Sequence, residues 1–303
     1  MTVTTDKITG HILAAFTIII WGTTFIASKI MLRDFSPVQV MILRFFIAYL
    51  VLWILNHKIQ KTSLREEMGF LLLAITGTTI YFLFENKALT ITNTSNVSIL
   101  LSVAPVFTVI LAHIFTRDEK INRYVILGAI IAFLGVAMVV FNGTIMLKLS
   151  PAGDVLSIGA ALSWAVYSII LKKYVGRYDS IYLTRKVVFY SIITTLPILF
   201  AENASFPLQD LKNSTMIGCL LFLGVLGSGI CYVTWNMAVG RLGIVATNNY
   251  IYLSPFITMV AGKLILDEHI SIMGIAGAVL IIAGVAAAGL RNNVKNQQIN
   301  STG

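Results

Sequence analysis

Long apolar runs separated by short polar breaks make up almost the whole chain. Each run is close to the length of about 20 residues that a helix needs to cross the hydrocarbon core of a bilayer. The runs are too long and too poor in turn residues for barrel strands, so only helices can pair every backbone group in lipid. The pattern predicts an all-α integral membrane protein with ten transmembrane helices. They are expected near residues 11–32, 38–55, 68–89, 95–115, 124–141, 155–174, 181–200, 216–239, 245–266 and 270–290.

The second half of the chain repeats the first. Gly77 and Pro105 in the first half correspond to Gly227 and Pro255 in the second. Because each copy holds an odd number of predicted spans, the two copies must cross the bilayer in opposite directions, as in many secondary transporters. We expect two inverted five-helix repeats, residues 1–147 and 148–303, with a disordered polar tail over 291–303. Further matched pairs are Ile80 and Ile230, Asn86 and Asn236, Ala88 and Ala238, Trp21 and Trp164, and Lys29 and Lys172.

Composition excludes a soluble protein and explains the basic charge. The mean hydropathy is +0.86, and only 12% of the residues are charged, which leaves too little polar surface for solution. Most Lys and Arg residues flank one set of predicted helix ends, which the positive-inside rule places in the cytoplasm together with both termini. These residues are scattered over several loops and form no single basic face, so we expect no nucleic-acid partner.

Short motifs occur in a fixed order along both halves and carry a family resemblance. In the first half the motifs are Trp21-Gly22, Arg44-Phe45, Ala88-Leu89 and Ala104-Pro105-Val106-Phe107, followed by the acidic pair Asp118-Glu119. In the second half they are Ala161-Leu162-Ser163-Trp164, Leu253-Ser254-Pro255, Asp267-Glu268 and Gly284-Val285. Their order and spacing are similar to those of the ten-helix EamA-type branch of the drug/metabolite transporter (DMT) superfamily, over about residues 10–290.

The resemblance implies a multi-pass carrier of the bacterial cytoplasmic (inner) membrane, with a cavity between inverted halves. It implies export of small metabolites, amino acids or amphiphilic drugs by alternating access, and it leaves the substrate class open. A carrier for sugar or phosphate-bearing substrates is the alternative among carriers, because organellar members of the superfamily move nucleotide sugars and phosphorylated sugars. Outside carriers, the alternative is a lipid scramblase or a lipid enzyme.

Arg44 lies deep inside one predicted span and Glu85 lies near the end of another, where charge is costly and usually functional. Arg44 has two interpretations. It is a structural charge whose partners are helix carbonyls or a buried acidic side chain, or it is a clamp for a substrate carboxylate. Glu85 has no acidic counterpart in the second half, where Trp235 stands at the matching position. Glu85 and Lys87 either anchor a helix end at the interface, or Glu85 faces the cavity and exchanges a proton for substrate.

Pro105 and Pro255 lie at matching positions near the middle of two predicted spans. A proline removes a backbone donor and clashes with the preceding turn, so each should kink its helix. Polar residues precede both prolines, among them Asn96 before the first, and Asn248 and Tyr250 before the second. We interpret the prolines as reciprocal hinges beside a polar site, with ordinary helix packing as the alternative.

Aromatic and amide side chains complete the expected cavity lining. Rings with few charges suit a semi-apolar ligand and attract a cation to their faces, although packing or an interfacial belt would also explain each ring alone. The expected cavity residues are Trp21, Arg44, Tyr81, Glu85, Asn86, Asn96, Trp164, Tyr232, Trp235, Asn236, Asn248 and Tyr250.

A glycine pair recurs in the last predicted span of each half, Gly128 with Gly135 and Gly277 with Gly284. Small residues on one helix face let two helices approach closely. We expect these two spans to pack against each other, with a homodimer contact as the alternative.

Motifs for catalysis are absent from the sequence. It contains no phosphate loop, zinc-protease helix, nucleophile elbow or cysteine cluster. The acidic pairs at 118–119 and 267–268 are expected on opposite membrane faces, so they cannot act as one pair of carboxylates. We expect no enzymatic activity, no cofactor and no metal; the expected partners are a small-molecule substrate and the lipid bilayer.

Overall fold

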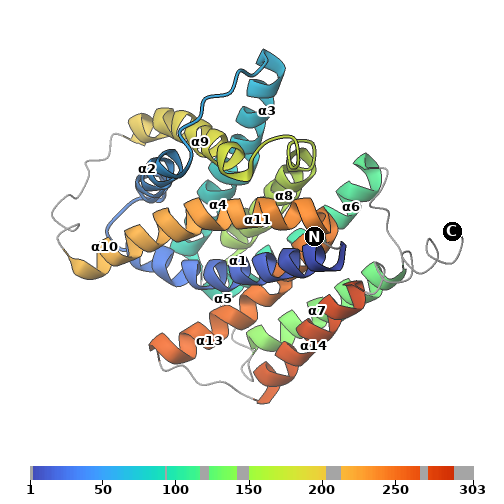
Figure 1. The fold of residues 1–303 in the computed structure, drawn as a ribbon. Coiled ribbons are helices and arrows are strands. Elements are labelled where there is room, and N and C mark those ends of the chain that lie inside the picture. The colour runs from blue at the N-terminus through green and yellow to red at the C-terminus, as the bar shows by residue number, and fades with distance from the viewer. Residues whose placement is uncertain are drawn as a thin grey trace, which may run out of the picture.

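The computed structural model describes residues 3–92, 94–116, 123–141, 150–202, 213–266 and 272–289. Within these ranges every named element is a helix, as the apolar runs predict (Figure 1). The first half contains α1 (Val3–Met31), α2 (Pro37–Leu55), α3 (Leu64–Ala74), η1 (Ile75–Ile80), α4 (Tyr81–Ile91), α5 (Thr94–Leu101), α6 (Ala104–Phe115) and α7 (Arg123–Phe141). The second contains α8 (Pro151–Leu171), α9 (Ser180–Glu202), α10 (Ser214–Leu221), η3 (Phe222–Ile230), α11 (Cys231–Leu242), α12 (Ile244–Asn248), η4 (Asn249–Leu253), α13 (Ser254–Leu266) and α14 (Ile272–Gly289).

Seven helical stretches among the described residues are long and apolar enough to cross a membrane. Two shorter apolar helices, Arg123–Met138 and Ile272–Val285, accompany them. The prediction of an all-α membrane protein is therefore confirmed. The acidic pairs at 118–119 and 267–268 and the tail 291–303 lie outside the described residues. The seven stretches are Thr5–Met31, Pro37–Leu55, Leu64–Ile91, Val97–Phe115, Pro151–Leu171, Ser180–Glu202 and Ser214–Leu242.

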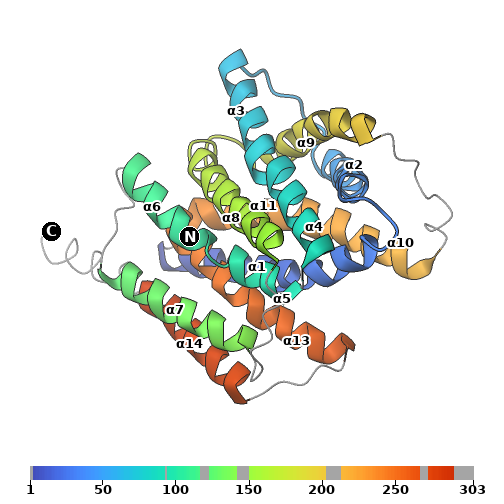
Figure 2. The same ribbon diagram turned by 180° about the vertical axis from the view of Figure 1, so that it is seen from behind.

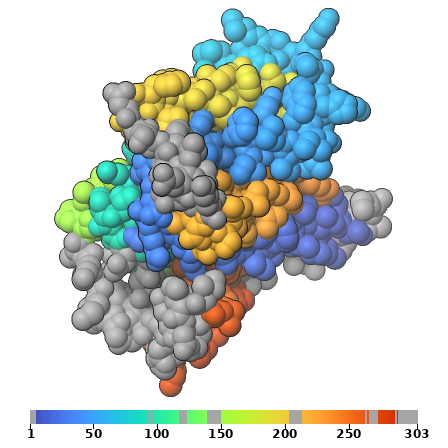
Figure 3. All heavy atoms as spheres, turned by 90° about the vertical axis from the view of Figure 1, so that its left-hand side faces the viewer, coloured from blue at the N-terminus to red at the C-terminus, as the bar shows by residue number. Residues whose placement is uncertain are grey.

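The two halves interlock through matched helix contacts. Helix α1 of the first half packs on α11 of the second, and α8 packs in the same way on α4. Helices α2 and α9 pack on each other, and α7 and α14 lie side by side at one edge of the bundle (Figures 1 and 2). On the face seen in Figure 3, yellow side chains of the second half lie directly against blue side chains of the first. The core therefore lies between the halves.

Two serines begin helices that follow short connections. The Ser36 hydroxyl accepts a hydrogen bond from the Gln39 N–H, and the Gln39 side chain accepts one from the Ser36 N–H at 2.9 Å. Ser63 and Glu66 form the same reciprocal capping box at the start of α3. Because each box satisfies two otherwise unpaired backbone donors, it fixes where α2 and α3 begin.

The repeated glycines form the contact between α7 and α14, as the sequence predicts. A methyl group on Gly135 would meet the Gly277 carbonyl oxygen at 2.6 Å, and one on Gly284 would meet the Gly128 oxygen at the same distance. The nearest atoms at both points belong to the backbone of the other helix, so the two backbones are in direct contact.

We expect Gly135→Ala to destabilise the protein because the added methyl group must push two backbones apart. Overpacking of this kind costs about 1–3 kcal/mol, which would appear as a lower unfolding temperature in detergent. Gly218→Ala is the matched control, since no atom lies within 4 Å of the position of its new methyl group. Equal unfolding temperatures for the two variants would contradict the close backbone contact.

Candidate functional site

Two π-helical turns occupy matching places in the two halves. Element η1 contains Gly77, and η3 contains the corresponding Gly227. In η3 the wider turn shows in the bond from the Cys231 N–H to the Leu226 carbonyl, five residues back instead of four. Single π-helical turns inside α-helices are rare and are frequent at functional sites. Both turns lead directly into helices, α4 and α11, that line a cavity.

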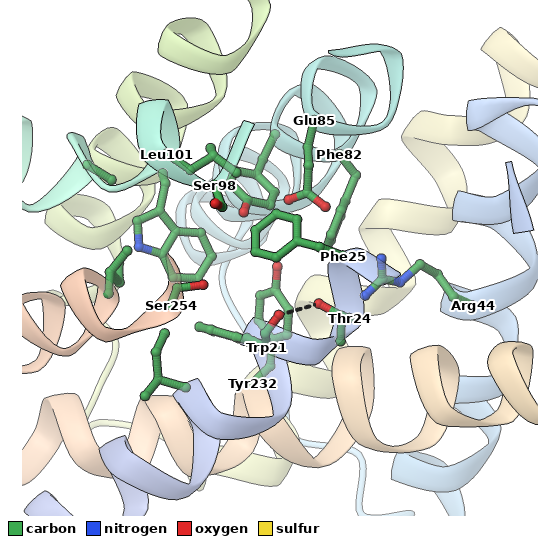
Figure 4. A pocket seen from close by; sticks show the side chains of 15 residues that line it. Trp21, Thr24, Phe25, Arg44, Phe82, Glu85, Ser98, Leu101, Tyr232 and Ser254 are labelled. Atoms are coloured by element: carbon green, nitrogen blue, oxygen red, sulfur yellow. Dashed lines mark hydrogen bonds between the residues drawn. The ribbon is translucent and has the colours of Figure 1, made fainter. Parts of the chain in front are cut away.

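The cavity lies between the two halves and has a volume of about 50 Å³. This is room for only a few water molecules. Almost all lining side chains are buried, so a larger ligand requires movement of the surrounding helices. Figure 4 shows side chains converging on it from several helices. The lining consists of Ile18, Trp21, Thr24, Phe25, Arg44, Tyr81, Phe82, Glu85, Ser98, Leu101, Ala104, Trp164, Tyr232, Ile251 and Ser254.

Arg44 brings a buried positive charge to the cavity. Its side chain is only 1% exposed, and its Nε donates a hydrogen bond to the Ser228 hydroxyl at 2.7 Å. The guanidinium carbon lies 4.1 Å from the ring centre of Phe82, an arrangement that stabilises the cation. Nη1 has no hydrogen-bond partner among the described residues. An unpaired, buried donor of a charged group is costly, so this nitrogen is suited to an anionic group of a ligand.

Glu85 brings the opposite charge to the same cavity. It is 3% exposed and is hydrogen-bonded to the Tyr81 hydroxyl one helical turn away. Figure 4 shows its carboxyl group and the Arg44 guanidinium pointing into the cavity from different helices. The two groups interact electrostatically, yet no ion pair joins them among the described residues. The cavity therefore presents separated positive and negative groups.

Aromatic rings form the remaining wall. The rings of Trp21 and Trp164 meet edge to face, with centres 5.2 Å apart and planes at 89°. Trp21 also contacts Tyr232 at 5.4 Å, and Tyr81 contacts Trp164 at 5.4 Å. Edge-to-face packing holds the rings in fixed orientations, and aromatic faces in a cavity wall can attract a cation.

The structure brings six of the predicted cavity residues to the cavity surface and places five others elsewhere. The six are Trp21, Arg44, Tyr81, Glu85, Trp164 and Tyr232. Trp235 lies behind the wall, with its ring 5.1 Å from that of Trp21. The Tyr250 hydroxyl bonds instead to the exposed His11 at 2.8 Å. The side chain of Asn96 lies outside the described residues.

Three of the predicted amides, Asn86, Asn236 and Asn248, bond to residues of other helices and do not line the cavity. Asn248 accepts a hydrogen bond from the Trp164 indole at 3.0 Å and donates to the Ile244 carbonyl at 2.8 Å. Asn236 donates to the Thr184 hydroxyl at 3.0 Å, and Asn86 donates to the Pro37 carbonyl at 3.4 Å. Amide groups pair both donors and acceptors, which suits them to join helices in the apolar interior.

Both prolines lie at helix starts beside the cavity. Pro105 is in the first turn of α6, directly after the break that follows α5. Pro255 is the second residue of α13, directly after the 3-10 turn η4. The residues before them, Ala104 and Ser254, both line the cavity. The expected interruption of the two helices is present, and hinge motion at these points stays a prediction.

Three residues of the site, Thr24, Phe82 and Ser228, were not predicted from the sequence. Thr24 lies one turn beyond Trp21, and Phe82 lies one turn before Glu85, so helical spacing from the selected residues could have found both. Ser228 follows the repeated Gly227, and its hydrogen bond to Arg44 depends on the π-helical turn, which hydropathy does not reveal.

A second polar cluster lies outside the cavity and joins α3 to α9. Lys186 forms an ion pair with Glu67 at 2.6 Å, and the Tyr190 hydroxyl bonds to the same carboxylate at 2.5 Å. The Arg185 guanidinium bonds to the backbone carbonyls of Asn56 and Lys58. The cluster ties the connection between α2 and α3 to the start of α9.

A family model matches the chain twice, over residues 8–141 and 151–290, and its description is EamA-like transporter family. The chain belongs to the EamA-like transporter family. This match confirms the resemblance to the DMT superfamily, and a general transport role follows.

Curated relatives of this EamA-like transporter align over nearly its full length. An uncharacterized transporter of Archaeoglobus fulgidus is 30% identical, over 91% of this chain and 95% of its own. A probable terminal-alkyne amino-acid exporter of Streptantibioticus cattleyicolor is 25% identical, with 95% of each chain covered. A probable amino-acid metabolite efflux pump of Salmonella typhimurium is 26% identical, over 90% of this chain and 92% of its own.

A solved crystal structure shares the fold of this EamA-like transporter. The TM-score is 0.73 at 18% identity, and the match covers 93% of this chain and 98% of that chain.

We expect Asn248→Leu to destabilise this EamA-like transporter by leaving the buried Trp164 indole N–H without its acceptor. An unpaired buried donor costs about 1–3 kcal/mol, measured as a lower unfolding temperature. In a Trp164→Phe background the same Asn248→Leu change should cost less, because the orphaned donor is gone. An undiminished loss in that background would show that Asn248 does not act through Trp164.

Proposed function

We propose that this chain is a secondary transporter that exports small amino-acid-like molecules by alternating access. The observation that carries the proposal is the pairing of Arg44 and Glu85 on separate walls of one buried, aromatic-lined cavity. A transporter role follows from the family, whereas the substrate, the direction and the mechanism are inferred from the site.

A zwitterion matches the charges of this cavity. The free Nη1 of Arg44 is suited to a carboxylate, which accepts charge-assisted hydrogen bonds from a guanidinium. The Glu85 carboxylate and the aromatic faces are suited to an ammonium group. Because one charge alone would leave the other buried and uncompensated, a ligand with both charges fits better than an amine or an acid.

Substrates with phosphate groups fit this cavity less well. A phosphate carries more negative charge than a carboxylate and is usually held by several basic groups. Arg44 is the sole Lys or Arg among the lining residues. The names of two relatives, an amino-acid exporter and an amino-acid metabolite efflux pump, support the same choice.

The packing supports ten spans in two inverted repeats. The contact of α1 with α11 has its counterpart in that of α8 with α4, and α2 with α9 and α7 with α14 are pairs of matching helices. Such reciprocity is what a twofold axis in the membrane plane produces. The α2–α3 and α8–α9 connections meet at one end, where basic residues gather: Lys58 and Arg177 lie in the connections, and Arg185 and Lys186 lie near the start of α9. The positive-inside rule favours the cytoplasm for this end, in the inner membrane of a bacterium.

Alternating access would open the cavity to one side at a time. Its lining is buried, so neither charged group reaches bulk water without movement of the helices. The breaks before Pro105 and Pro255 place an interruption beside the cavity in each half. A broken helix has fewer backbone hydrogen bonds to lose on bending, which suits both points as hinges.

We expect ligand-induced thermal stabilisation to distinguish a zwitterion from its singly charged fragments. L-phenylalanine at about 100 times its dissociation constant should stabilise the purified protein by roughly 2.7 kcal/mol. 2-Phenylethylamine and 3-phenylpropionate each lack one charge and should stabilise it far less. The Arg44→Lys substitution should weaken binding of the amino acid by about tenfold to a hundredfold, since charged hydrogen bonds are lost.

Arg185→Lys is the matched control for Arg44→Lys. Arg185 is also a buried arginine over an aromatic ring, 4.8 Å from the ring centre of Trp53, but it does not line the cavity. Binding should therefore survive this substitution. Stabilisation by the amine or by nucleotide sugars alone, or by none of the twenty amino acids, would refute the amino-acid proposal.

We expect Glu85→Gln to uncouple transport from a proton gradient. A carboxyl group that holds either a proton or the substrate ammonium exchanges one for the other across the membrane. In proteoliposomes an imposed pH gradient should accelerate amino-acid flux by the unmodified protein and leave that by Glu85→Gln unchanged. Glu67→Gln, outside the cavity, is the control and should keep the response; an intact response in Glu85→Gln would exclude this role.

A further inference from the structure

Each π-helical turn is bonded to an aromatic side chain from the other half. The Trp21 indole on α1 donates a hydrogen bond to the Gly227 carbonyl in η3 at 2.9 Å. The Tyr232 hydroxyl on α11 donates to the Gly77 carbonyl in η1, also at 2.9 Å. Both donors line the cavity, and both acceptors are the repeated glycines. The two bonds therefore cross between the halves in reciprocal fashion.

The two bonds are physically connected to each other. The rings of Trp21 and Tyr232 are in contact, with centres 5.4 Å apart and planes at 67°. Displacement of one ring therefore removes packing from the other. Tyr232 is the second residue after η3, so a change in the turn to which Trp21 is bonded moves the donor that bonds to the opposite turn.

The turns also control the charged groups of the cavity. A π-helical turn contains an extra residue, and its conversion to α-helix shifts the register of everything that follows. Tyr81 and Glu85 follow η1, so their orientation depends on that turn. Ser228 within η3 accepts the hydrogen bond from Arg44. A ligand that binds the guanidinium therefore affects the same turn to which the Trp21 indole is bonded.

We propose that the hydrogen bonds Trp21–Gly227 and Tyr232–Gly77 are reciprocal latches that keep the two halves closed around the cavity. Trp21 and Tyr232 are positioning residues, and release of either bond loosens both π-helical turns and admits water to the cavity. The proposal rests on the proposed transport function, but its test measures opening and needs neither a substrate nor a flux.

Cysteine accessibility reports the opening directly. Leu101→Cys, in a background with Cys219→Ala and Cys231→Ala, places a single thiol on the cavity wall. Trp21→Phe and Tyr232→Phe keep a ring and delete the hydrogen-bond donor. Each should raise the rate of labelling by a water-soluble maleimide about twofold to tenfold, which corresponds to the loss of one hydrogen bond.

Two matched substitutions control for the loss of ring size and of a hydroxyl group. Trp235→Phe and Tyr252→Phe change buried residues whose polar atoms have no hydrogen-bond partner among the described residues. They should leave the labelling rate unchanged. The proposal is overturned if these controls accelerate labelling as much as the latch substitutions, or if the latch substitutions do not accelerate it.

Amide hydrogen exchange tests the coupling between the turns. Tyr232→Phe deletes the bond to η1, yet exchange should accelerate in η3 as well, and Trp21→Phe should act in the reverse sense. Acceleration confined to the turn that lost its bond would mean a local structural role. The unmodified protein provides a further arm that needs no substitution: both turns should exchange with a single opening rate, and two distinct rates would overturn the proposal.

Discussion

Polar groups inside a membrane protein have no water to bond with, and this constraint organises the whole bundle. Hydroxyl pairs join the halves at several depths, including Thr17 with Thr234 and Thr78 with Ser191, both at 2.6 Å. Such pairs contribute about 0.6 kcal/mol each in membrane proteins, so they orient helices more than they stabilise them. Among the described residues a few buried polar atoms lack a hydrogen-bond partner, and the Arg44 nitrogen is the one of these that belongs to a cavity-lining residue. A ligand in the cavity could therefore complete its pairing.

The framework is symmetric, whereas the charges are not. Matching helices, matching π-helical turns and matching prolines surround the cavity. Glu85 nevertheless occurs in the first half alone, because the second has Trp235 at that position. In the proposed mechanism, a symmetric framework would let the two sides of the membrane exchange roles, and an asymmetric pair of charges would distinguish the two ends of a small zwitterion. Different residues form the framework and the charged groups, so either set can vary without the other.

The cavity, at about 50 Å³, has room for only a few water molecules. Its small size follows from the rings that fill the space between the halves, with Trp21, Trp164 and Tyr232 in mutual contact. Movement of rings that also bond to the π-helical turns would change cavity size and helix register together. Cavity opening and the orientation of the charged groups are thereby linked through backbone geometry.

The sequence by itself determined the helices, because apolar runs of bilayer length have no other structure that pairs their backbone groups. It also indicated the principal cavity residues, since Arg44 and Glu85 are costly in an apolar run unless they face protein or water. The hydrogen-bond partners of Asn236 and Asn248 could not be predicted from the sequence, because an amide in a helix fits a binding site and a structural contact equally well. The π-helical turns could not be predicted either, since hydropathy does not distinguish them from α-helix. Only the tertiary structure decided the register after each turn, and with it which side chains reach the cavity and which stand behind its wall.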